Sequence, residues 1–253
     1  MNDFNLASLI QIIKKLNIEV EKIKLSDFSY SLKEDASPLT QADLLVNQRL
    51  TDFIRTTKVK NIISEEAVNK EYKIRKNWYK YWVIDPIDGT KEFINKSTEY
   101  TINIALCAGS KPEFGLVSCP ASGDIYHAFY KNGSFLNNKQ INVSKKKTNK
   151  IKVVASKSHL NSDTKNYINH LKQKGDIDLK NYGSSLKICK IAEGLADIYP
   201  RFSPTMEWDT CAAEIILTEA GGQILTTENK KMKYNKPDLK NPYFIASAKK
   251  ILQ

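Results

Sequence analysis

The sequence predicts a layered α/β protein made of two sub-domains, and three observations support this fold class. Apolar residues recur at helical spacing from Leu9 to Leu16, which predicts an amphipathic helix near the N-terminus. Between residues 100 and 130, short runs alternate apolar and polar positions as strands do, and Asn132-Gly133 adds a hairpin signal. Beyond residue 150, strand and helix patterns alternate. We therefore expect helices packed on an antiparallel sheet, followed by a smaller α/β half.

The remaining elements are expected at defined positions. Thr40, with Asp43 three residues later, resembles a capping box, so a helix is expected to begin there. The segment 144–150 is polar, charged and without periodicity, which places a sub-domain boundary there and gives sub-domains 1–146 and 147–253. In the second sub-domain we expect helices at 161–173, 184–194 and 207–220, and strands at 151–155, 222–226 and 243–246.

Composition excludes several classes of protein. A chain of 253 residues can bury about three-quarters of its unfolded surface, so it needs no disulfides. Its four cysteines lie in apolar segments without a Cys-x-x-Cys pair, which predicts buried, reduced thiols and no zinc site. The net charge of +11 comes from lysines spread along the chain, without a basic helix face or aromatic platforms, so nucleic-acid binding is not expected. No signal peptide or stable membrane insertion is expected either. We predict a cytoplasmic protein and leave peripheral association with the inner face of the membrane open.

The strongest chemical signal lies between Trp82 and Phe93, in Trp-Val-Ile-Asp-Pro-Ile-Asp-Gly-Thr-Lys-Glu-Phe. The apolar run predicts a buried strand, and the proline suits a first helical turn in which Asp85 and Asp88 would lie on one face. Carboxylates held this close favour Mg²⁺ or Mn²⁺, and the amides of Gly89 and Thr90 would form an anion seat. Taken alone, the segment is equally consistent with a surface turn, because Asp, Pro and Gly all favour turns.

Three other acidic positions have structural as well as functional interpretations. Asp43 on its own is favoured as a helix cap. Glu65 and Glu66 follow a short apolar run, and because neighbours on an extended chain point in opposite directions, only one of them is expected to face a metal. Asp209 lies near the start of its helix, where the helix dipole favours an acid. The residues alone leave these alternatives open.

Taken together, these stretches resemble the signature of the Mg²⁺-dependent, lithium-sensitive phosphatases of the inositol monophosphatase type. Lys91-Glu92-Phe93 replaces the Thr-Asn-Phe usual in inositol monophosphatases and resembles the CysQ-type 3'(2'),5'-bisphosphate nucleotidase branch. The similarity runs from about residue 33 to 222 and implies the αβαβα sandwich shared with fructose-1,6-bisphosphatase. The matching blocks are Asp43, Glu65-Glu66, Asp85-Pro-Ile-Asp-Gly-Thr90, Gly183–Lys187, Ala192–Phe202, and Trp208-Asp209 followed after eleven residues by Gly221-Gly222.

The resemblance also implies roles for individual residues in metal-assisted hydrolysis of a phosphate monoester. It implies two or three Mg²⁺ ions per site, two of them about 4 Å apart, with Mn²⁺ as a substitute. Asp43 would accept a hydrogen bond from the Thr90 hydroxyl, and Thr90 would hold the attacking water. Glu65 would accept the proton of that water. The implied metal ligands are Glu65, Asp85, the carbonyl of Ile87, Asp88 and Asp209. The implied substrate contacts are Glu65, Ile87, Asp88, Gly89, Thr90, Asp209, Ser158, His159, Gly183, Ser184 and Lys187.

The expected substrate is the small anionic nucleotide 3'-phosphoadenosine 5'-phosphate, cleaved to AMP and phosphate in sulfur assimilation or nucleotide recycling. Lys157 stands where bisphosphate nucleotidases often have Arg, so any phosphate contact there would be a point charge and not a bidentate grip. For the neighbouring His159, an exposed loop residue is as consistent as a substrate contact. The alternative function is an inositol or other sugar-phosphate phosphatase with the same metal site. Monomer and homodimer are both consistent with the sequence.

Overall fold

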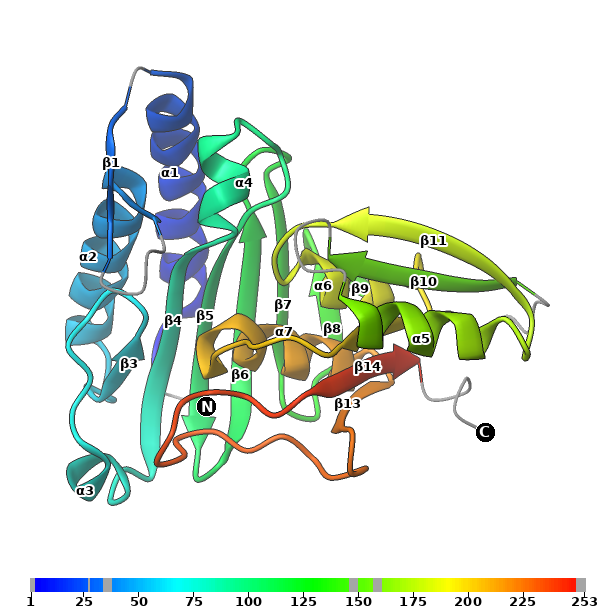
Figure 1. Ribbon diagram of the computed structural model, residues 1–253. Coiled ribbons are helices and arrows are strands. Elements are labelled where there is room, and N and C mark those ends of the chain that lie inside the picture. Colours follow the sequence, from blue (N-terminus) through cyan, green and yellow to red (C-terminus); the bar gives the residue numbers. More distant parts are fainter. Residues whose placement is uncertain (1–2, 27, 34–37, 146–149, 157–160, 249–253) are drawn as a thin grey trace.

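The computed structural model describes residues 3–26, 28–33, 38–145, 150–156 and 161–248, which form five layers (Figure 1). Helices α1 (Leu6–Leu25) and α2 (Gln41–Thr56) cover one face of a seven-stranded sheet. Helices α6 (Leu186–Ala192) and α7 (Glu207–Glu219) lie between that sheet and a five-stranded sheet. Helix α5 (Ser162–Leu171) packs on the outer face of the five-stranded sheet. This arrangement confirms the predicted αβαβα sandwich.

The seven-stranded sheet follows the chain almost in order. Its order is β3-β4-β5-β6-β7-β8-β9, and only β3 and β4 are parallel neighbours. Consecutive hairpins join the other strands, as the alternating pattern and the Asn132-Gly133 turn predicted. The strands are β3 (Ile62–Ser64), β4 (Lys80–Asp88), β5 (Thr101–Ala108), β6 (Lys111–Cys119), β7 (Asp124–Phe129), β8 (Ser134–Leu136) and β9 (Lys139–Ile141).

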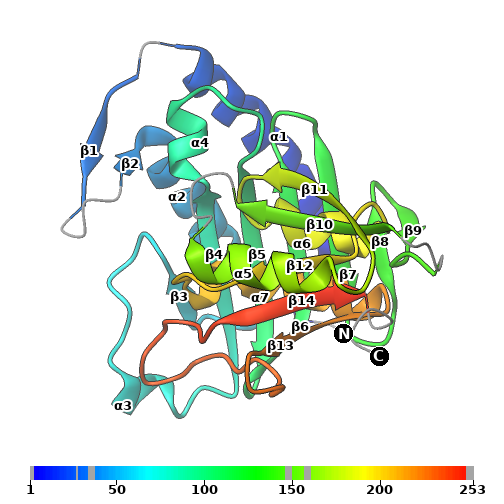
Figure 2. The same ribbon diagram turned by 45° about the vertical axis from the view of Figure 1, so that its right-hand side comes forward.

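The five-stranded sheet crosses in front of the seven-stranded one in Figure 2, in the order β11-β10-β12-β14-β13. Its strands are β10 (Lys150–Ser156), β11 (Asp176–Tyr182), β12 (Ile198–Arg201), β13 (Gly222–Thr226) and β14 (Phe244–Ala248). Short elements complete the described fold: β1 (Tyr30–Leu32), β2 (Pro38–Thr40), α3 (Tyr72–Arg75) and α4 (Thr90–Ile94). The predicted boundary at residues 146–147 touches a segment outside the described residues, so the sub-domain division stays a prediction.

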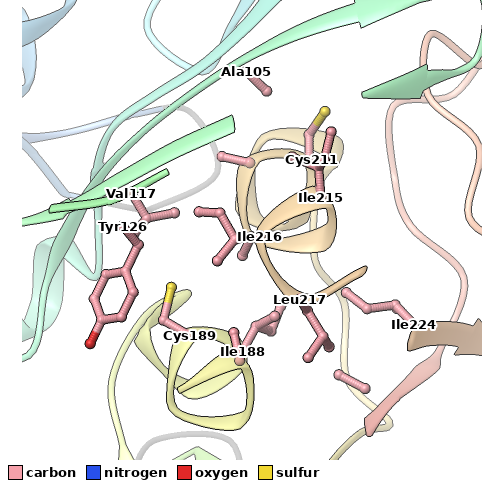
Figure 3. Packing of buried hydrophobic residues seen from close by; sticks show 14 of the residues in the cluster. Ala105, Val117, Tyr126, Ile188, Cys189, Cys211, Ile215, Ile216, Leu217 and Ile224 are labelled. Carbon is pink, nitrogen blue, oxygen red and sulfur yellow. The ribbon is translucent and has the colours of Figure 1, made fainter. Parts of the chain in front are cut away.

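The core between the two sheets is formed by both halves of the chain. Figure 3 shows Ile216 of α7 directed toward Val117 and Tyr126 of the larger sheet, with Cys189 of α6 beside them. Gly115 of β6 allows this close approach, because a Cβ atom there would lie 2.4 Å from the carbonyl oxygen of Ala212. Helix α7 is therefore fixed against the larger sheet although its sequence follows the smaller sheet's first strands.

The cysteines agree with the prediction of buried thiols. In the part of the chain that the structure describes, all four cysteines are buried and free of disulfides. Two of them, Cys107 and Cys211, have their sulfur atoms 3.3 Å apart across the β5–α7 contact. No helix within the described ranges is both long enough and apolar enough to span a membrane.

Candidate active site

A β-bulge in β4 places two carboxylates on the same face of the larger sheet. Asp85 is paired with Asn103 of β5 and Asp88 with Thr101, so β4 contains one residue more than β5 between these pairs. Residues three apart on a regular strand point to opposite faces, but one extra residue restores the same face. Pro86 is tolerated at the bulge because it has no N–H to donate to the ladder. The predicted helical turn over Asp85 and Asp88 is therefore wrong, since α4 begins only at Thr90.

Asp209 joins these two carboxylates from the other half of the chain. In the described part of the molecule, Asp85, Asp88 and Asp209 each place one carboxylate oxygen within 4.8 Å of the other two. Asp209 lies in the first turn of α7, and its Oδ2 atom accepts from the backbone N–H of Met206 at 2.8 Å. It therefore serves the helix end and the acidic cluster at once, because a carboxylate has a second oxygen to offer.

The electrostatics of the cluster favour a bound cation. Burial, reinforced by Glu65, Asp88 and Asp209, raises the pKa of Asp85 well above its ordinary value. Burial also raises the pKa of Asp88 to about 6 and, with repulsion from Asp88, that of Asp209 to about 8. Both carboxylate oxygens of Asp85 are buried without a hydrogen-bond partner among the described residues. Such orphaned oxygens fit a hard divalent cation such as Mg²⁺.

Glu65 lies at the edge of this cluster and is held by a lysine. The Nζ atom of Lys33 lies 2.8 Å from Glu65 Oε1 and also contacts Glu66 Oε1. The two glutamates follow the end of β3 in a turn where strand alternation does not apply, so the reason given for their opposite directions does not hold. Only Glu65 of the two lines the cavity described below, as expected for the one that faces a metal. Although burial opposes it, contact with both acids raises the pKa of Lys33, which is therefore a fixed positive charge.

Asp43 and Thr90 are not paired with each other in the structure. Asp43 Oδ2 accepts from the backbone N–H of Thr40 at 2.7 Å and from its hydroxyl at 2.5 Å, completing the capping box of α2. The Thr90 hydroxyl donates its one proton to the carbonyl of Ile87 at 3.0 Å. The pairing of these residues implied by the resemblance is thus not formed, and the capping interpretation of Asp43 describes this structure. Burial raises the pKa of Asp43 to about 6.

Two buried cations also line the site. Lys187, in the first turn of α6, is buried and donates to the carbonyls of Ser184 at 2.6 Å and Tyr182 at 3.2 Å. Burial lowers its pKa to about 8, against the attraction of Asp88. Arg201 of β12 is also buried and donates to the Tyr199 hydroxyl and to two backbone carbonyls. The two cations provide a wall suited to an anion.

A cavity of about 820 Å³ brings these groups together. Its lining contains every predicted site residue within the described ranges except Asp43, which lies behind Thr40, and Gly183, whose neighbour Ser184 does line it. Lys157, Ser158 and His159 lie outside the described residues, and Ser156 just before them lines the cavity. The lining includes Glu65, Asp85, Ile87, Asp88, Gly89, Thr90 and Asp209, together with Lys187, Tyr199 and Arg201.

Sequence reasoning missed four residues that the structure brings to the site. Lys33 and Arg201 were given no role. An arginine inside the apolar run from Ile198 to Phe202 does indicate a functional residue, because arginine is seldom buried unless it is paired. Tyr199 and Ser185 belong to segments that matched the family pattern, but their single-residue signals are weak. Their importance depends on the contact between the two halves of the chain.

These observations define a five-layer α/β protein whose clustered, buried carboxylates share a cavity with buried cations. The profile of the Inositol monophosphatase family matches residues 5–253, and the chain belongs to this family.

Three comparisons place the chain more narrowly. The 3'(2'),5'-bisphosphate nucleotidase CysQ of Buchnera aphidicola subsp. Acyrthosiphon pisum (strain APS) is 37% identical over 209 residues, which are 81% of this chain and 77% of the relative. The crystal structure of CysQ from Bacteroides thetaiotaomicron has a TM-score of 0.86 at 33% identity and covers 97% of this chain and 98% of its own. An IMPase/NADP phosphatase complexed with Mg²⁺ and phosphate shares the fold, with a TM-score of 0.80 at 19% identity, covering 96% of this chain and 90% of its own.

Proposed function

We propose that this chain is a Mg²⁺-dependent 3'(2'),5'-bisphosphate nucleotidase that hydrolyses 3'-phosphoadenosine 5'-phosphate to AMP and phosphate. The observation that carries the proposal is the buried, unpartnered carboxylate of Asp85 between Asp88 and Asp209. Three acids so placed repel one another unless a cation lies among them. The relatives named CysQ support the choice of a nucleotide bisphosphate as the substrate.

The proposed cation ligands are Asp85, Asp88, Asp209, Glu65 and the carbonyl of Ile87. Mg²⁺ bound there would supply a Lewis acid for the phosphoryl oxygens and lower the pKa of a bound water. Mn²⁺ is the proposed substitute, because it prefers the same oxygen ligands.

The chain's own groups then hold the water and the phosphate. The Thr90 hydroxyl gives its proton to Ile87, so its oxygen is left to accept from an attacking water and to orient it. Glu65, fixed by Lys33, is the proposed acceptor of the water's proton. The backbone amides at Gly89 and Thr90 are the proposed donors to the phosphate being cleaved.

The cationic wall supports a substrate with a second phosphate. Lys187 and Arg201 line the same cavity as the carboxylates and are held by backbone carbonyls, so their charges are already oriented before a ligand binds. Cations bound among the carboxylates would occupy Asp88 and Asp209, the acids whose charges otherwise act on Lys187 and Arg201. A bisphosphate would engage the carboxylate side through one phosphate and the cationic side through the other.

The test compares phosphate release from 3'-phosphoadenosine 5'-phosphate and from inositol 1-phosphate, each with Mg²⁺ and with EDTA. We expect faster release from the nucleotide and none with EDTA. Faster release from the inositol ester would overturn the substrate but keep the metal site. Release that continues in EDTA would overturn the cation-dependent mechanism.

Arg201→Gln provides a sharper test of the second phosphate. Losing a charged hydrogen bond costs about 1.5–3 kcal/mol, so KM for the bisphosphate should rise at least about tenfold. The KM of a slow monophosphate substrate should change much less. Equal changes for both substrates would contradict the proposed role of the cationic wall.

A further inference from the structure

Three buried polar side chains form a closed ring where the two halves of the chain meet. Thr101 and Asn103 project from β5, and Ser185 lies just before α6. Their exposed fractions are 0%, 1% and 3%. The Thr101 and Ser185 hydroxyl oxygens are 2.8 Å apart, Ser185 Oγ lies 2.7 Å from Asn103 Oδ1, and Asn103 Nδ2 lies 3.3 Å from Thr101 Oγ1.

Chemistry fixes the direction of this ring. An amide nitrogen can only donate and an amide oxygen can only accept, so Asn103 donates to Thr101 and accepts from Ser185. Since the Ser185 proton is committed to Asn103, the Thr101 hydroxyl must donate to Ser185. Each member therefore donates once and accepts once around the ring. Hydrogen bonds arranged head to tail in this way polarise and strengthen one another in a buried site.

The ring lies beside the carboxylates on the same face of the larger sheet. Thr101 is the cross-strand partner of Asp88 and Asn103 that of Asp85, so the ring members stand opposite the two acids of the β4 bulge. The same face of β5 continues with Ala105 and Cys107, which belong to the apolar core. The polar pair is therefore confined to the stretch of β5 that faces the acids.

Ser185 links the ring to one acid directly. Its backbone N–H donates to Asp88 Oδ2, while its side chain is held by both residues of β5. This bond occupies one oxygen of Asp88 and leaves the other for a cation. A shift of Ser185 would rotate the Asp88 carboxylate, because this N–H is the only hydrogen-bond donor to Asp88 among the described residues.

We infer that Thr101, Asn103 and Ser185 are positioning residues that aim Asp88 at a divalent cation. The inference rests on the proposed function, because it takes Asp88 to be a cation ligand. Partners behind a metal ligand typically change metal affinity by about 10–100-fold when they are removed. A ring that served only stability would leave the affinity of the folded protein unchanged.

The test uses a matched set of threonine variants and Mn²⁺ alone as the probe. Thr101→Val keeps the shape and removes the hydroxyl, and Thr101→Ser keeps the hydroxyl. Thr164→Val is the control, because Thr164 is also buried and donates to an asparagine, Asn161, at 2.8 Å, but on α5 away from the site. Mn²⁺ affinity of the metal-free proteins is measured by calorimetry, and the free energy of unfolding by urea titration with EDTA.

We expect Thr101→Val to weaken Mn²⁺ binding about tenfold, Thr101→Ser to restore it, and Thr164→Val to lose stability with unchanged affinity. If Thr101→Val does not fold, Ser185→Ala breaks the same ring from the side of α6 and should weaken binding in the same way. Affinity equal to wild type in either folded variant would overturn the inference while leaving the proposed function intact. Absence of Mn²⁺ binding by the wild-type chain would instead overturn the proposed site, and the inference with it.

Discussion

Replacing Asp85 by Asn should stabilise the metal-free protein while abolishing turnover. Asp85 is 1% exposed, and neither of its carboxylate oxygens has a hydrogen-bond partner among the described residues. Without a cation, the folded chain must either bury this charge beside Asp88 and Asp209 or protonate it. An asparagine at the same position carries no charge, so the repulsion with both neighbours disappears.

The size of the effect follows from the cost of protonation. Protonating a carboxyl whose ordinary pKa is 3.8 costs about 5 kcal/mol at pH 7.5, and this sets the largest penalty that the metal-free site can carry. The variant avoids this penalty, but burying the amide N–H groups of Asn without partners costs it about 1–3 kcal/mol. We therefore expect the variant to be more stable by about 2 to 4 kcal/mol in EDTA.

The sign of the pH dependence can be checked in the same experiment. A folded-state pKa raised above the unfolded value gives stability that is present below pH 3.8 and is lost as pH rises through the raised pKa. The advantage of Asp85→Asn should thus vanish toward pH 4 and be largest at alkaline pH.

Urea unfolding in EDTA and in Mg²⁺, beside a phosphate-release assay, tests this reasoning. The wild-type chain should be stabilised by Mg²⁺ and the variant should not. Asp52→Asn, at an exposed acid of α2 that contacts Arg55, should change stability by less than about 0.5 kcal/mol. A metal-free Asp85→Asn protein that is less stable than wild type at pH 7.5 would refute the argument, as would a variant with full activity.

Two further predictions concern residues outside the carboxylate cluster. Burial raises the pKa of Glu214 to about 7, so this carboxyl alone should contribute about 3 kcal/mol to the stability that the wild-type chain loses between pH 4.5 and pH 8.5. Glu214→Gln should remove this share; urea unfolding across the range checks it, and parallel pH profiles of the two proteins would contradict it. Gly183→Ala would place a Cβ atom 2.3 Å from the carbonyl oxygen of Glu99, so the turn before Ser185 must shift. We expect the free energy of unfolding to fall by more than about 2 kcal/mol and Mn²⁺ to bind more weakly. Gly109→Ala, at a positive φ but in open space, should cost only about 1–2 kcal/mol and keep the affinity, so equal behaviour of the two variants would count against the turn's role.

Much of the fold could be predicted because its strands and helices carry strong periodic patterns. Residues 101–107 of β5 and the apolar run of α7 are buried by neighbouring layers. Their apolar residues therefore indicate which parts of the chain pack in the core. Strand β11 was not predicted, because it is an edge strand with no fully buried residue and a mostly polar sequence. Its pairing with β10 depends on backbone hydrogen bonds that leave no trace in composition.

The site was predictable in its residue types but not in its geometry. The spacing of Asp85 and Asp88 fits a helical turn as well as a bulged strand, and only the pairing with β5 decides between them. The contact of Lys33 with both Glu65 and Glu66 joins segments more than thirty residues apart, so no local pattern contains it. Arg201 and Lys187 likewise become one wall only when the five-stranded sheet docks.

The extra residue in β4 has a consequence for the entropy of cation binding. The bulge releases the Ile87 carbonyl from the regular ladder and directs the two flanking carboxylates to one side, so four consecutive residues offer three oxygen donors on a single strand. At the proposed cation site this set would act as a preformed chelate, because its conformational freedom is already lost when the sheet folds. Asp209 is the exception, because it reaches the chelate only through the docking of α7 against the larger sheet.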